Sequence, residues 1–439
     1  MTVSKVESTG APGSTPPSFD VLVAGGGPAG SATATWLARE GLRVVLCEKE
    51  EFPRFHIGES LLPYSVPLLR DLGAWPLLRE AGFQEKFGGE FLFEPGGSRF
   101  RIDFSEGIEP CRDRALHVRR TEFDRILLDH AASRGVEVRS GARVSRVLFE
   151  GDRAVGARIE DSSGARNLRS RAVIDATGRG TLIGRQLGLR DRDPALGQAS
   201  LFAHYRGARM GLGRAGGDIL VVRNPRIGGW YWMIPLEEET TSVGAVFSAS
   251  AIRSLDVEDR GERLDALLDL SPEISHRLVG ADRISPVRGA ADFSYRLRRF
   301  GGAGWLAVGD AAAFLDPVFS SGVHLALASG RLASRRVLRS LGRNGTLGPG
   351  EVRAYERELG RALDRIRRWI LGYYDPHFQT IFTHPDPPRF FESPVISFLA
   401  GRFFRWDLRT WIVDRLMHGL AGLLRTRERL RPGQPPEDG

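Results

Sequence analysis

Residues 20–48 alternate between short apolar runs and a helical pattern. Residues 21–24 are apolar, residues 29–40 carry apolar side chains at helical spacing, and residues 44–47 are again apolar. Short apolar runs bounded by glycine are typical of buried strands, and a 3.6-residue period is typical of a helix. The pattern therefore predicts a strand, a helix and a second strand.

The turn between the first strand and the helix is rich in glycine. Gly25, Gly27 and Gly30 occupy the glycine positions of G-x-G-x-x-G, and Glu48 follows the second strand. In dinucleotide-binding folds these glycines allow a tight turn, the approach of a pyrophosphate and close helix packing, while the acid accepts a ribose hydroxyl. A flexible loop before a helix is the alternative, but it leaves the position of Glu48 unexplained.

Hydrophobic periodicity predicts further elements along the chain. Residues 90–104 alternate around a Pro-Gly-Gly turn, as in a hairpin, and residues 199–251 have a strand pattern. Two other apolar strands end in small-residue turns, at 177–178 and 309–310. Other expected elements are helices at 120–132, 252–280 and 353–371, strands at 136–138, 143–149, 154–160, 172–174 and 305–308, and a final amphipathic region at 395–424.

Composition narrows the class of protein. A chain of 439 residues exceeds the usual size of one hydrophobic core, so two or more domains are expected. Its two cysteines, Cys47 and Cys111, cannot form a disulfide framework, and the N-terminus has no secretory pattern, so we expect a cytoplasmic protein. No run of 18 apolar residues occurs, so no membrane span is expected.

The net charge of +8 comes almost entirely from arginine, because only three of the 62 basic residues are lysines. Genome composition is one explanation, and attraction of an acidic partner such as a carrier protein is another. The sequence has no nucleic-acid-binding signature and no metal-ligand spacing among its nine histidines. We therefore expect neither nucleic acid nor metal.

The three glycine-marked turns follow strands whose ends would meet on one extended ligand. This set resembles the FAD-binding fold of aromatic-hydroxylase flavoproteins. The resemblance implies an α/β protein with a Rossmann-like three-layer FAD-binding domain, an inserted antiparallel β-sheet substrate domain and a C-terminal helical region. It also implies that Arg120 and Asp310 contact the flavin, although Asp310 can cap a helix as well. The implied FAD-binding residues are Gly25, Gly27, Pro28, Ala29, Gly30, Glu48, Lys49, Arg120, Asp310, Pro317, Gly322 and Val323.

The same resemblance implies domain boundaries. The amphipathic region at 395–424 is expected to cover the substrate pocket, because a large enclosed site needs apolar cover; membrane-surface attachment is the alternative. The expected parts are a disordered tail at 1–18, an FAD-binding domain at 19–195 and 286–345, strands at 88–112 added to the substrate side, a β-sheet substrate domain at 196–285, a helical cap at 346–426 and a polar tail at 427–439.

Three separated motifs narrow the family. Residues 52–63 read FPRFHIGESLLP, residues 230–235 form W-x-W-x-I-P, and residues 316–322 read DPVFSSG. In this order they resemble the motifs of flavin-dependent halogenases, over about residues 19–340. The resemblance implies an enzyme that uses FADH2, O2 and chloride or bromide. A separate flavin reductase would supply the FADH2, because the chain has no dedicated nicotinamide motif.

Two motifs have simpler alternatives. By resemblance Trp230, Trp232, Ile234 and Pro235 shield the flavin, but alternate tryptophans on a strand face one side, which a packed core also explains. By resemblance the backbone N–H groups of Ser321 and Gly322 bind halide at a helix start. An ordinary serine N-cap has the same pattern.

Lys86 matches the catalytic lysine of the family. Hypohalous acid, formed from halide by reduced flavin and O2, can be hydrogen-bonded and polarised by a lysine ammonium, or its halogen can pass to the amine. Arginine cannot take the amine route, because its guanidinium stays protonated. A solvated loop charge is the alternative interpretation of Lys86.

Phe319 stands where members acting on tryptophan carry a glutamate near the lysine. The absence of this glutamate favours a substrate ring that stabilises the reaction cation with its own heteroatom. We therefore expect a phenol or pyrrole, either free or thioester-bound to a carrier protein, and a role in natural-product (antibiotic) biosynthesis. One competing interpretation is an FAD-dependent aromatic monooxygenase, a hydroxylase using NAD(P)H. Another is a flavoprotein that only binds a partner, which Lys86 and W-x-W-x-I-P argue against.

Overall fold

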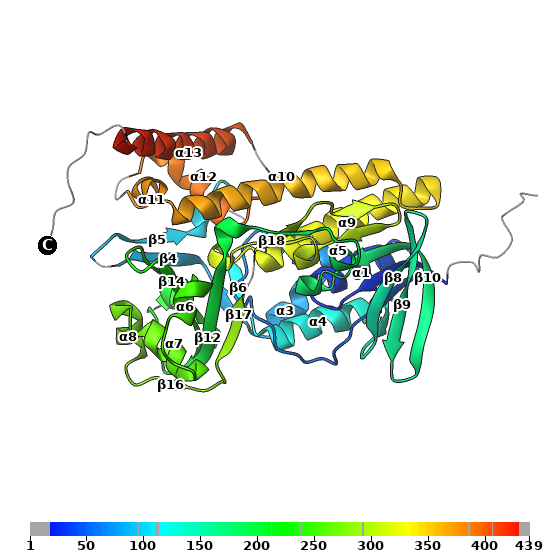
Figure 1. Cartoon of the computed structure of the whole chain (residues 1–439), viewed down its shortest axis with the longest axis horizontal. Coiled ribbons are helices and arrows are strands. Elements are labelled where there is room, and N and C mark those ends of the chain that lie inside the picture. Colours follow the sequence, from blue (N-terminus) through cyan, green and yellow to red (C-terminus); the bar gives the residue numbers. More distant parts are fainter. Residues whose placement is uncertain are drawn as a thin grey trace, which may run out of the picture.

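The computed structural model describes residues 18–94, 96–109, 114–211, 213–237, 239–291, 294–384, 387–405 and 407–429. The disordered tail expected at 1–18 and the polar tail expected at 427–439 lie almost wholly outside these residues, and Cys111 lies outside them too. Figure 1 shows two β-rich halves side by side, with helix α10 (Pro349–Tyr374) running along both of them.

One half is built on a mainly parallel sheet with the strand order β19-β20-β10-β1-β2-β7. β1 (Phe19–Ala24) pairs in parallel with β10 (Gly164–Asp175) and with β2 (Val44–Cys47), so the two apolar runs predicted at the start are neighbouring strands. The other elements of this half are β7 (Glu137–Arg139), β8 (Arg143–Glu150), β9 (Arg153–Asp161), β19 (Gly301–Gly302), β20 (Trp305–Ala307), α1 (Pro28–Arg39), α2 (Ser65–Leu72), α3 (Trp75–Glu80), α4 (Arg120–Ser133), α5 (Leu182–Gln186) and α9 (Gly322–Asn344).

The other half is a sheet with the strand order β16-β12-β15-β14-β13-β4-β5, and β17 also pairs with β12. Its strands pair antiparallel, except that β4 (Gly88–Phe93) runs parallel to β13 (Ile219–Asn224). The hairpin predicted at 90–104 is β4 with β5. The other elements here are β5 (Arg99–Asp103), β12 (Gln198–Arg206), β14 (Gly229–Pro235), β15 (Thr240–Ser248), β16 (Asp282–Arg283), β17 (Arg288–Ala291), α6 (Ala249–Arg253), α7 (Arg260–Leu268) and α8 (Pro272–Leu278).

Two small sheets complete the strands. β3 (Gln84–Lys86) pairs antiparallel with β6 (Ala115–His117). β18 (Tyr295–Leu297) pairs with both β11 (Arg190–Arg192) and β21 (Ala313–Phe314).

After α10 the chain continues as α11 (Pro376–Phe382), α12 (Arg389–Leu399) and α13 (Leu408–Arg429). The amphipathic region predicted at 395–424 is thus divided between two helices, and Gly401, with φ of +108°, lies in the connection. Asp414 anchors α13 by accepting hydrogen bonds from Trp369 Nε1 (2.8 Å) and Arg368 Nη1 (2.6 Å) of α10. In the part of the chain that the structure describes, no helix combines the length and apolar character needed to cross a bilayer.

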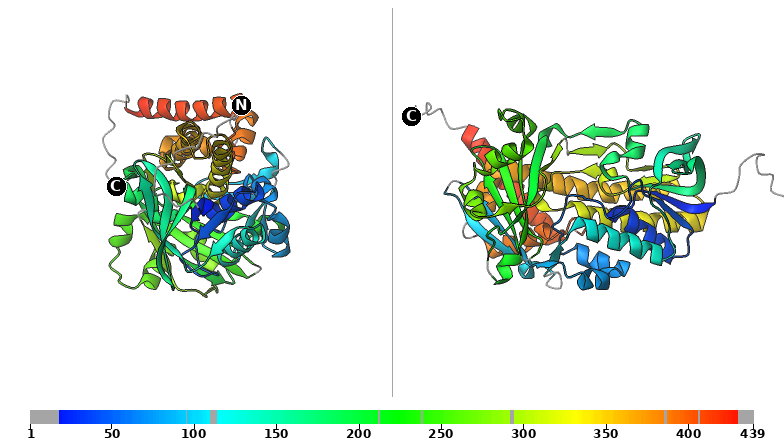
Figure 2. Two further views of the ribbon diagram at one scale, coloured as in Figure 1. Left: turned by 90° about the vertical axis from the view of Figure 1, so that its right-hand side faces the viewer. Right: turned by 90° about the horizontal axis from the view of Figure 1, so that it is seen from below.

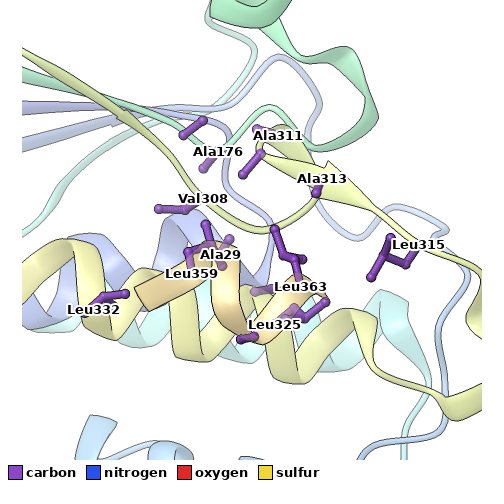
Figure 3. Close-up of a cluster of buried hydrophobic side chains, with 14 of the residues drawn as sticks. Ala29, Ala176, Val308, Ala311, Ala313, Leu315, Leu325, Leu332, Leu359 and Leu363 are labelled. Atoms are coloured by element: carbon purple, nitrogen blue, oxygen red, sulfur yellow. The ribbon is translucent and has the colours of Figure 1, made fainter. Parts of the chain in front are cut away.

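Helices α9 and α10 run side by side, as the two views of Figure 2 and their contacts agree. Between them and the strand ends, small and aliphatic side chains pack closely (Figure 3). Ala176 follows β10 and Val308 follows β20, while Leu325 comes from α9 and Leu363 from α10. This packing fixes the turns that follow the parallel strands.

Candidate active site

A cavity of about 1490 Å³ lies where β1, β10 and β20 end, and all three predicted turns line it. Gly25 has φ of +107°, and a Cβ on it would lie 2.3 Å from the Ala176 carbonyl oxygen. A Cβ on Gly30 would lie 1.8 Å from the Gly25 carbonyl oxygen. Both positions therefore require glycine, because the turn and helix α1 approach each other too closely for a side chain.

Gly27 has a different surrounding. A Cβ there would meet only Arg54 Nη2, at 3.3 Å, so the space in front of this backbone belongs to the cavity. Gly27 is also the N-cap of α1, whose first N–H groups have no partner inside the helix. This backbone fits a pyrophosphate, which such N–H groups and the helix dipole favour.

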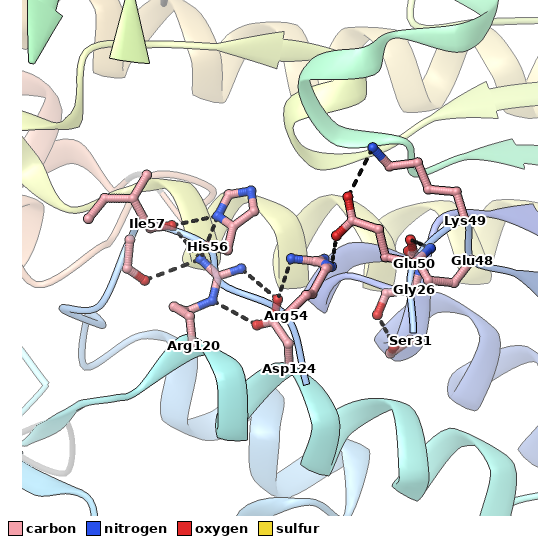
Figure 4. A network of polar contacts seen from close by, with 11 residues as sticks. Gly26, Ser31, Glu48, Lys49, Glu50, Arg54, His56, Ile57, Arg120 and Asp124 are labelled. Carbon is pink, nitrogen blue, oxygen red and sulfur yellow. Dashed lines mark hydrogen bonds and ion pairs between the residues drawn. The ribbon is translucent and has the colours of Figure 1, made fainter. Parts of the chain in front are cut away.

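Glu48 is held at the rim of the cavity. Its side chain is buried, with Oε2 accepting the Gly26 N–H at 2.6 Å and Oε1 accepting the Glu50 N–H at 2.9 Å (Figure 4). Each carboxylate oxygen has a second lone pair, so Glu48 can still accept a ribose hydroxyl. The glycine turn and the acid thus fit the adenosine and pyrophosphate parts of FAD.

Arg120 joins α4 to the motif at residues 52–63. Its guanidinium donates to both carboxylate oxygens of Asp124, at 2.7 and 2.9 Å, and to the Ile57 carbonyl at 2.6 Å (Figure 4). His56 Nδ1 lies 3.3 Å from the same guanidinium. Burial, followed by the charge of Arg120, lowers the pKa of His56 to about 4, so the imidazole is neutral at pH 7.

Asp310 also lines the cavity and follows β20, far from Glu48 in sequence. Burial raises its carboxyl pKa to about 6, while the charges of Arg120 and Arg179 oppose this rise. The short turn that contains Asp310 (Gly309–Ala311) has Val308 as its N-cap, so the helix-cap alternative for Asp310 is wrong. A polar flavin chain would provide the partners that burial withholds.

The tryptophan motif forms one wall of the cavity. Trp230, Trp232 and Ile234 line it, with the two indole rings 5.8 Å apart. Tyr231 and Met233 point to the opposite face of β14 and belong to a separate core. The alternation expected of a strand is therefore present, and its tryptophan face borders a cavity of cofactor size.

The start of α9 forms another part of the wall. Ser321 and Gly322 line the cavity, and Ser321 is the N-cap, but its side chain makes no capping hydrogen bond. Ser320, just before, has φ of +53°, a left-handed backbone that costs energy outside glycine. The serine-cap interpretation is thus not supported by the geometry, and the helix start remains available to an anion.

Lys86 is the last residue of β3 and is only 2% exposed, so it is not a solvated loop charge. Its Nζ donates to Ser60 Oγ at 2.9 Å and to the Leu61 carbonyl at 3.4 Å. Burial lowers the pKa of Lys86 to about 7, although the charge of Asp218 favours the ammonium form. At neutral pH both the amine and the ammonium are therefore populated.

A second, small chamber of about 20 Å³ lies beside Lys86. Phe104, Phe319 and Leu399 are among its lining, and Ile219 separates it from the large cavity by lining both. Val318 and Ser320 also line both spaces, and Ser60 lines the large one. Lys86 therefore sits between a cofactor-sized cavity and an apolar chamber.

The structure brings most of the predicted residues to one place. Sequence reasoning missed Ser60 as the partner of Lys86, although it stands in the GES part of a quoted motif. Gly30 packs against the turn, and neither it nor Pro235 lines the cavity. The predicted residues that line it are Gly25, Gly27, Pro28, Ala29, Glu48, Lys49, Arg120, Trp230, Trp232, Ile234, Asp310, Pro317, Ser321, Gly322 and Val323.

Comparison with known proteins gives consistent results. A family model described as tryptophan halogenase matches residues 20–112 and 111–380. The chain is 32% identical to a 1H-pyrrole-2-carbonyl-[peptidyl-carrier protein] chlorinase of Pseudomonas fluorescens, over 92% of this chain and 94% of that protein. It is 33% identical to the corresponding brominase of Pseudoalteromonas luteoviolacea, over 90% of this chain and 94% of that protein.

Two solved halogenase structures also superpose on this chain. The flavin-dependent brominase Bmp2 superposes with a TM-score of 0.83 at 28% identity, over 94% of this chain and 99% of that one. The myxobacterial chondrochloren halogenase CndH, a FAD-dependent halogenase, superposes with a TM-score of 0.77 at 30% identity, over 91% of this chain and 96% of that one.

Proposed function

The chain belongs to the tryptophan halogenase family of flavin-dependent halogenases, and we propose that it halogenates a pyrrole or phenol ring that a carrier protein holds as a thioester. The observation that carries the proposal is the place of Lys86, buried between the large cavity and an apolar chamber. Two relatives named for pyrrolyl carrier-protein substrates match this chain over about nine tenths of its length, which supports the tethered ring.

The large cavity is the proposed FAD site. Gly25 and Gly27 with the α1 N-terminus hold the pyrophosphate, Glu48 the ribose, and Arg120 and Asp310 the flavin end. When bound, reduced FAD would give two electrons to O2, which would also oxidise the halide, so that FADH2, O2, halide and a proton would yield FAD, hypohalous acid and water. The N–H groups of Ser321 and Gly322 hold the halide, and the face of Trp230 and Trp232 keeps the organic substrate out of this cavity.

Lys86 is the proposed catalytic residue. Its Nζ takes up the hypohalous acid, either by a hydrogen bond from the ammonium or by transfer of the halogen to the amine. In the amine route the N–halogen bond forms as the O–halogen bond breaks, and the hydroxide leaves with an amine proton as water; the halogen then passes to a ring carbon and the proton of that carbon returns to the nitrogen. In the ammonium route the O–halogen bond breaks as the halogen bonds to the ring carbon, and the hydroxide leaves with the ring proton as water. Ser60 Oγ orients Nζ during this step through its 2.9 Å contact.

The lining of the chamber supports an electron-rich ring. Its side chains, apart from Lys86 and Ser320, are apolar, and Phe319 occupies the position where the tryptophan-specific pattern has a glutamate. A ring cation formed there meets no carboxylate among the lining residues. A pyrrole nitrogen or phenol oxygen stabilises such a cation itself, whereas a less activated ring does not.

The test is product mass spectrometry with FADH2, halide and matched substrates. We expect a pyrrole-2-carbonyl or hydroxybenzoyl thioester on a carrier protein to be halogenated at least about 10-fold faster than the free acid, because tethering raises the effective concentration of the ring. Equal rates for tethered and free rings would contradict the carrier assignment and leave the halogenase reaction standing.

Reduced flavin is proposed to come from a separate flavin reductase. Oxidised FAD-loaded protein mixed with NADH or NADPH in a stopped-flow absorbance experiment should stay oxidised, with and without the aromatic substrate. Rapid flavin reduction stimulated by the aromatic substrate would instead favour the hydroxylase interpretation.

A further inference from the structure

Tyr374, the last residue of α10, connects two motifs that are far apart in sequence. Its hydroxyl accepts the Trp230 Nε1–H at 2.9 Å and donates to Asp316 Oδ2 at 2.8 Å. Trp230 belongs to the tryptophan wall, and Asp316 begins the segment that leads into α9. Both partners are almost completely buried, with exposed fractions of 2% and 0%.

Asp316 passes this contact on to the proposed halide site. Its Oδ1 accepts the Val318 N–H at 3.0 Å and so closes the short turn Pro317–Phe319. That turn leads directly into Ser320, with its left-handed backbone, and Ser321 at the α9 N-terminus. The two carboxylate oxygens of Asp316 thus bind Tyr374 and the Pro317–Phe319 turn, and this fixes the position of the turn relative to Tyr374.

The strand pair that carries Trp230 has a second contact with Tyr374, through Arg223. Arg223 faces Trp230 across the β13–β14 ladder, and its Nη1 donates to the Gly229 carbonyl at 2.6 Å. The same guanidinium lies 5.2 Å from the Tyr374 ring centroid. Burial raises the pKa of Asp316 to about 6, while the hydrogen bonds from Tyr374 and Val318 and the positive charge of Arg223 oppose this rise.

We propose that Tyr374 is a positioning residue, which holds the tryptophan wall and the α9 start at one separation so that hypohalous acid reaches Lys86 instead of escaping. The proposal rests on the halogenase chemistry proposed above. Val318 and Ser320, on the segment that Asp316 fixes, line both the large cavity and the chamber. A change in their position would therefore alter the passage between the two spaces.

The test compares Tyr374→Phe with Tyr355→Phe. Tyr355 lies on the same helix, is fully buried, and donates its hydroxyl to the Ala307 carbonyl at 2.6 Å, away from both motifs. Each variant removes one hydroxyl oxygen from the same helix. Tyr374→Phe loses the hydrogen bonds to Trp230 and Asp316, and Tyr355→Phe loses the bond to Ala307, so a general loss of stability should affect both. The measurements are FAD affinity, FADH2 reoxidation, product per reoxidised flavin, and hypohalous acid released to monochlorodimedone in solution.

We expect Tyr374→Phe to bind FAD and reoxidise FADH2 as the wild type does. Its product per reoxidised flavin should fall by at least roughly 3- to 10-fold, the scale of a single lost hydrogen bond, because the missing hydroxyl makes two, and monochlorodimedone halogenation should rise. Tyr355→Phe should keep the wild-type ratio. Equal ratios in the two variants would overturn the proposal and leave the Tyr374 contacts a purely structural role.

Asp316→Asn provides a second route if Tyr374→Phe does not fold. It should shift the same ratio, and the double variant should show less than the sum of the two free-energy effects, because both substitutions break one connection. Additive effects would contradict the connection. The monochlorodimedone measurement needs no aromatic substrate, so an error in the proposed carrier-bound ring would leave this result readable.

Discussion

The proposed FAD cavity and the Lys86 chamber differ in size and in the segments that line them. The cavity measures about 1490 Å³ and lies at the adjacent ends of β1, β10 and β20, where the glycine turns form part of its wall. The chamber holds about 20 Å³, room for about one water, and is filled by side chains from sequence-distant segments. The proposed cofactor site therefore has room before any side chain moves, whereas an aromatic ring can enter the chamber only when side chains such as Phe319 or Leu399 move.

The largest expected effect is that of Lys86→Ala, which should nearly abolish halogen transfer at the chamber and leave the flavin reaction in the cavity unchanged. Lys86→Ala should leave FAD binding and FADH2 reoxidation intact, because Nζ contacts Ser60 and Leu61 and does not line the large cavity. Halogenated product should fall by about 100-fold or more, the usual contribution of positioning with general-acid assistance. The measurement is product per reoxidised flavin.

Lys86→Arg is the matched control for charge. It keeps a cation but cannot form the amine, so it should fail nearly as badly as Lys86→Ala if halogen passes to nitrogen. Partial activity would instead favour a cationic hydrogen bond. A wild-type yield from Lys86→Ala would mean that the residue or the reaction has been assigned wrongly.

The second effect is on the other region. Gly27→Val would place a side chain where the cavity approaches the α1 N-terminus, and it should weaken FAD binding by about 10- to 100-fold, the scale of one charge-assisted hydrogen bond. Gly342→Val on α9, where a Cβ meets nothing within 4 Å, controls for valine in a helix. Fluorescence titration measures both, and full FAD affinity in Gly27→Val would show that the pyrophosphate lies elsewhere.

The same contrast explains what the sequence could reveal. Gly25 and Gly30 are demanded by local backbone approach, which leaves a spacing pattern that can be read from one chain. Lys86 was found through resemblance, but its burial was not, because Lys86 pairs with Ala115 of β6, about thirty residues later, and its Nζ contacts Ser60 and Leu61 of an earlier segment. Tyr374 left no sequence signal at all: its partners lie 144 and 58 residues away.

The sequence pattern also did not locate the break between the C-terminal helices, for a related reason. The region at 395–424 has one continuous apolar period, yet the chain turns near Gly401, between α12 and α13. After this turn α13 is held against α10 by the contact of its Asp414 with Trp369. A helical period reports which residues face the core, and it does not report where tertiary contacts turn the chain. The division into α12 and α13 matters here, because Leu399 of α12 reaches the chamber.

A smaller effect is expected from Phe319→Leu, which acts on the chamber alone. The ring is buried and packs edge-on against Tyr373 and Phe398, so the shorter side chain should cost about 1 kcal/mol of unfolding free energy. FAD affinity should not change, whereas the KM for bulky free phenols should fall as the chamber widens. Urea unfolding and steady-state kinetics measure the two effects, and a loss of FAD affinity would show that the regions are not separable.

The smallest expected effect is a pH dependence confined to halogen transfer. The pKa of Lys86, lowered to about 7 by burial against the opposing charge of Asp218, means that its amine fraction rises from about one tenth at pH 6 to about nine tenths at pH 8. His117, also buried nearby, has its pKa lowered well below the usual range by burial and stays neutral over this interval.

If halogen passes to the amine, product per reoxidised flavin should rise several-fold from pH 6 to 8, with a midpoint near 7, while FAD affinity stays constant. Lys86→Arg should lack this midpoint, since its guanidinium does not titrate there. A fall over the same range would assign the step to the ammonium, and a flat profile in the wild type would remove Lys86 from the transfer step.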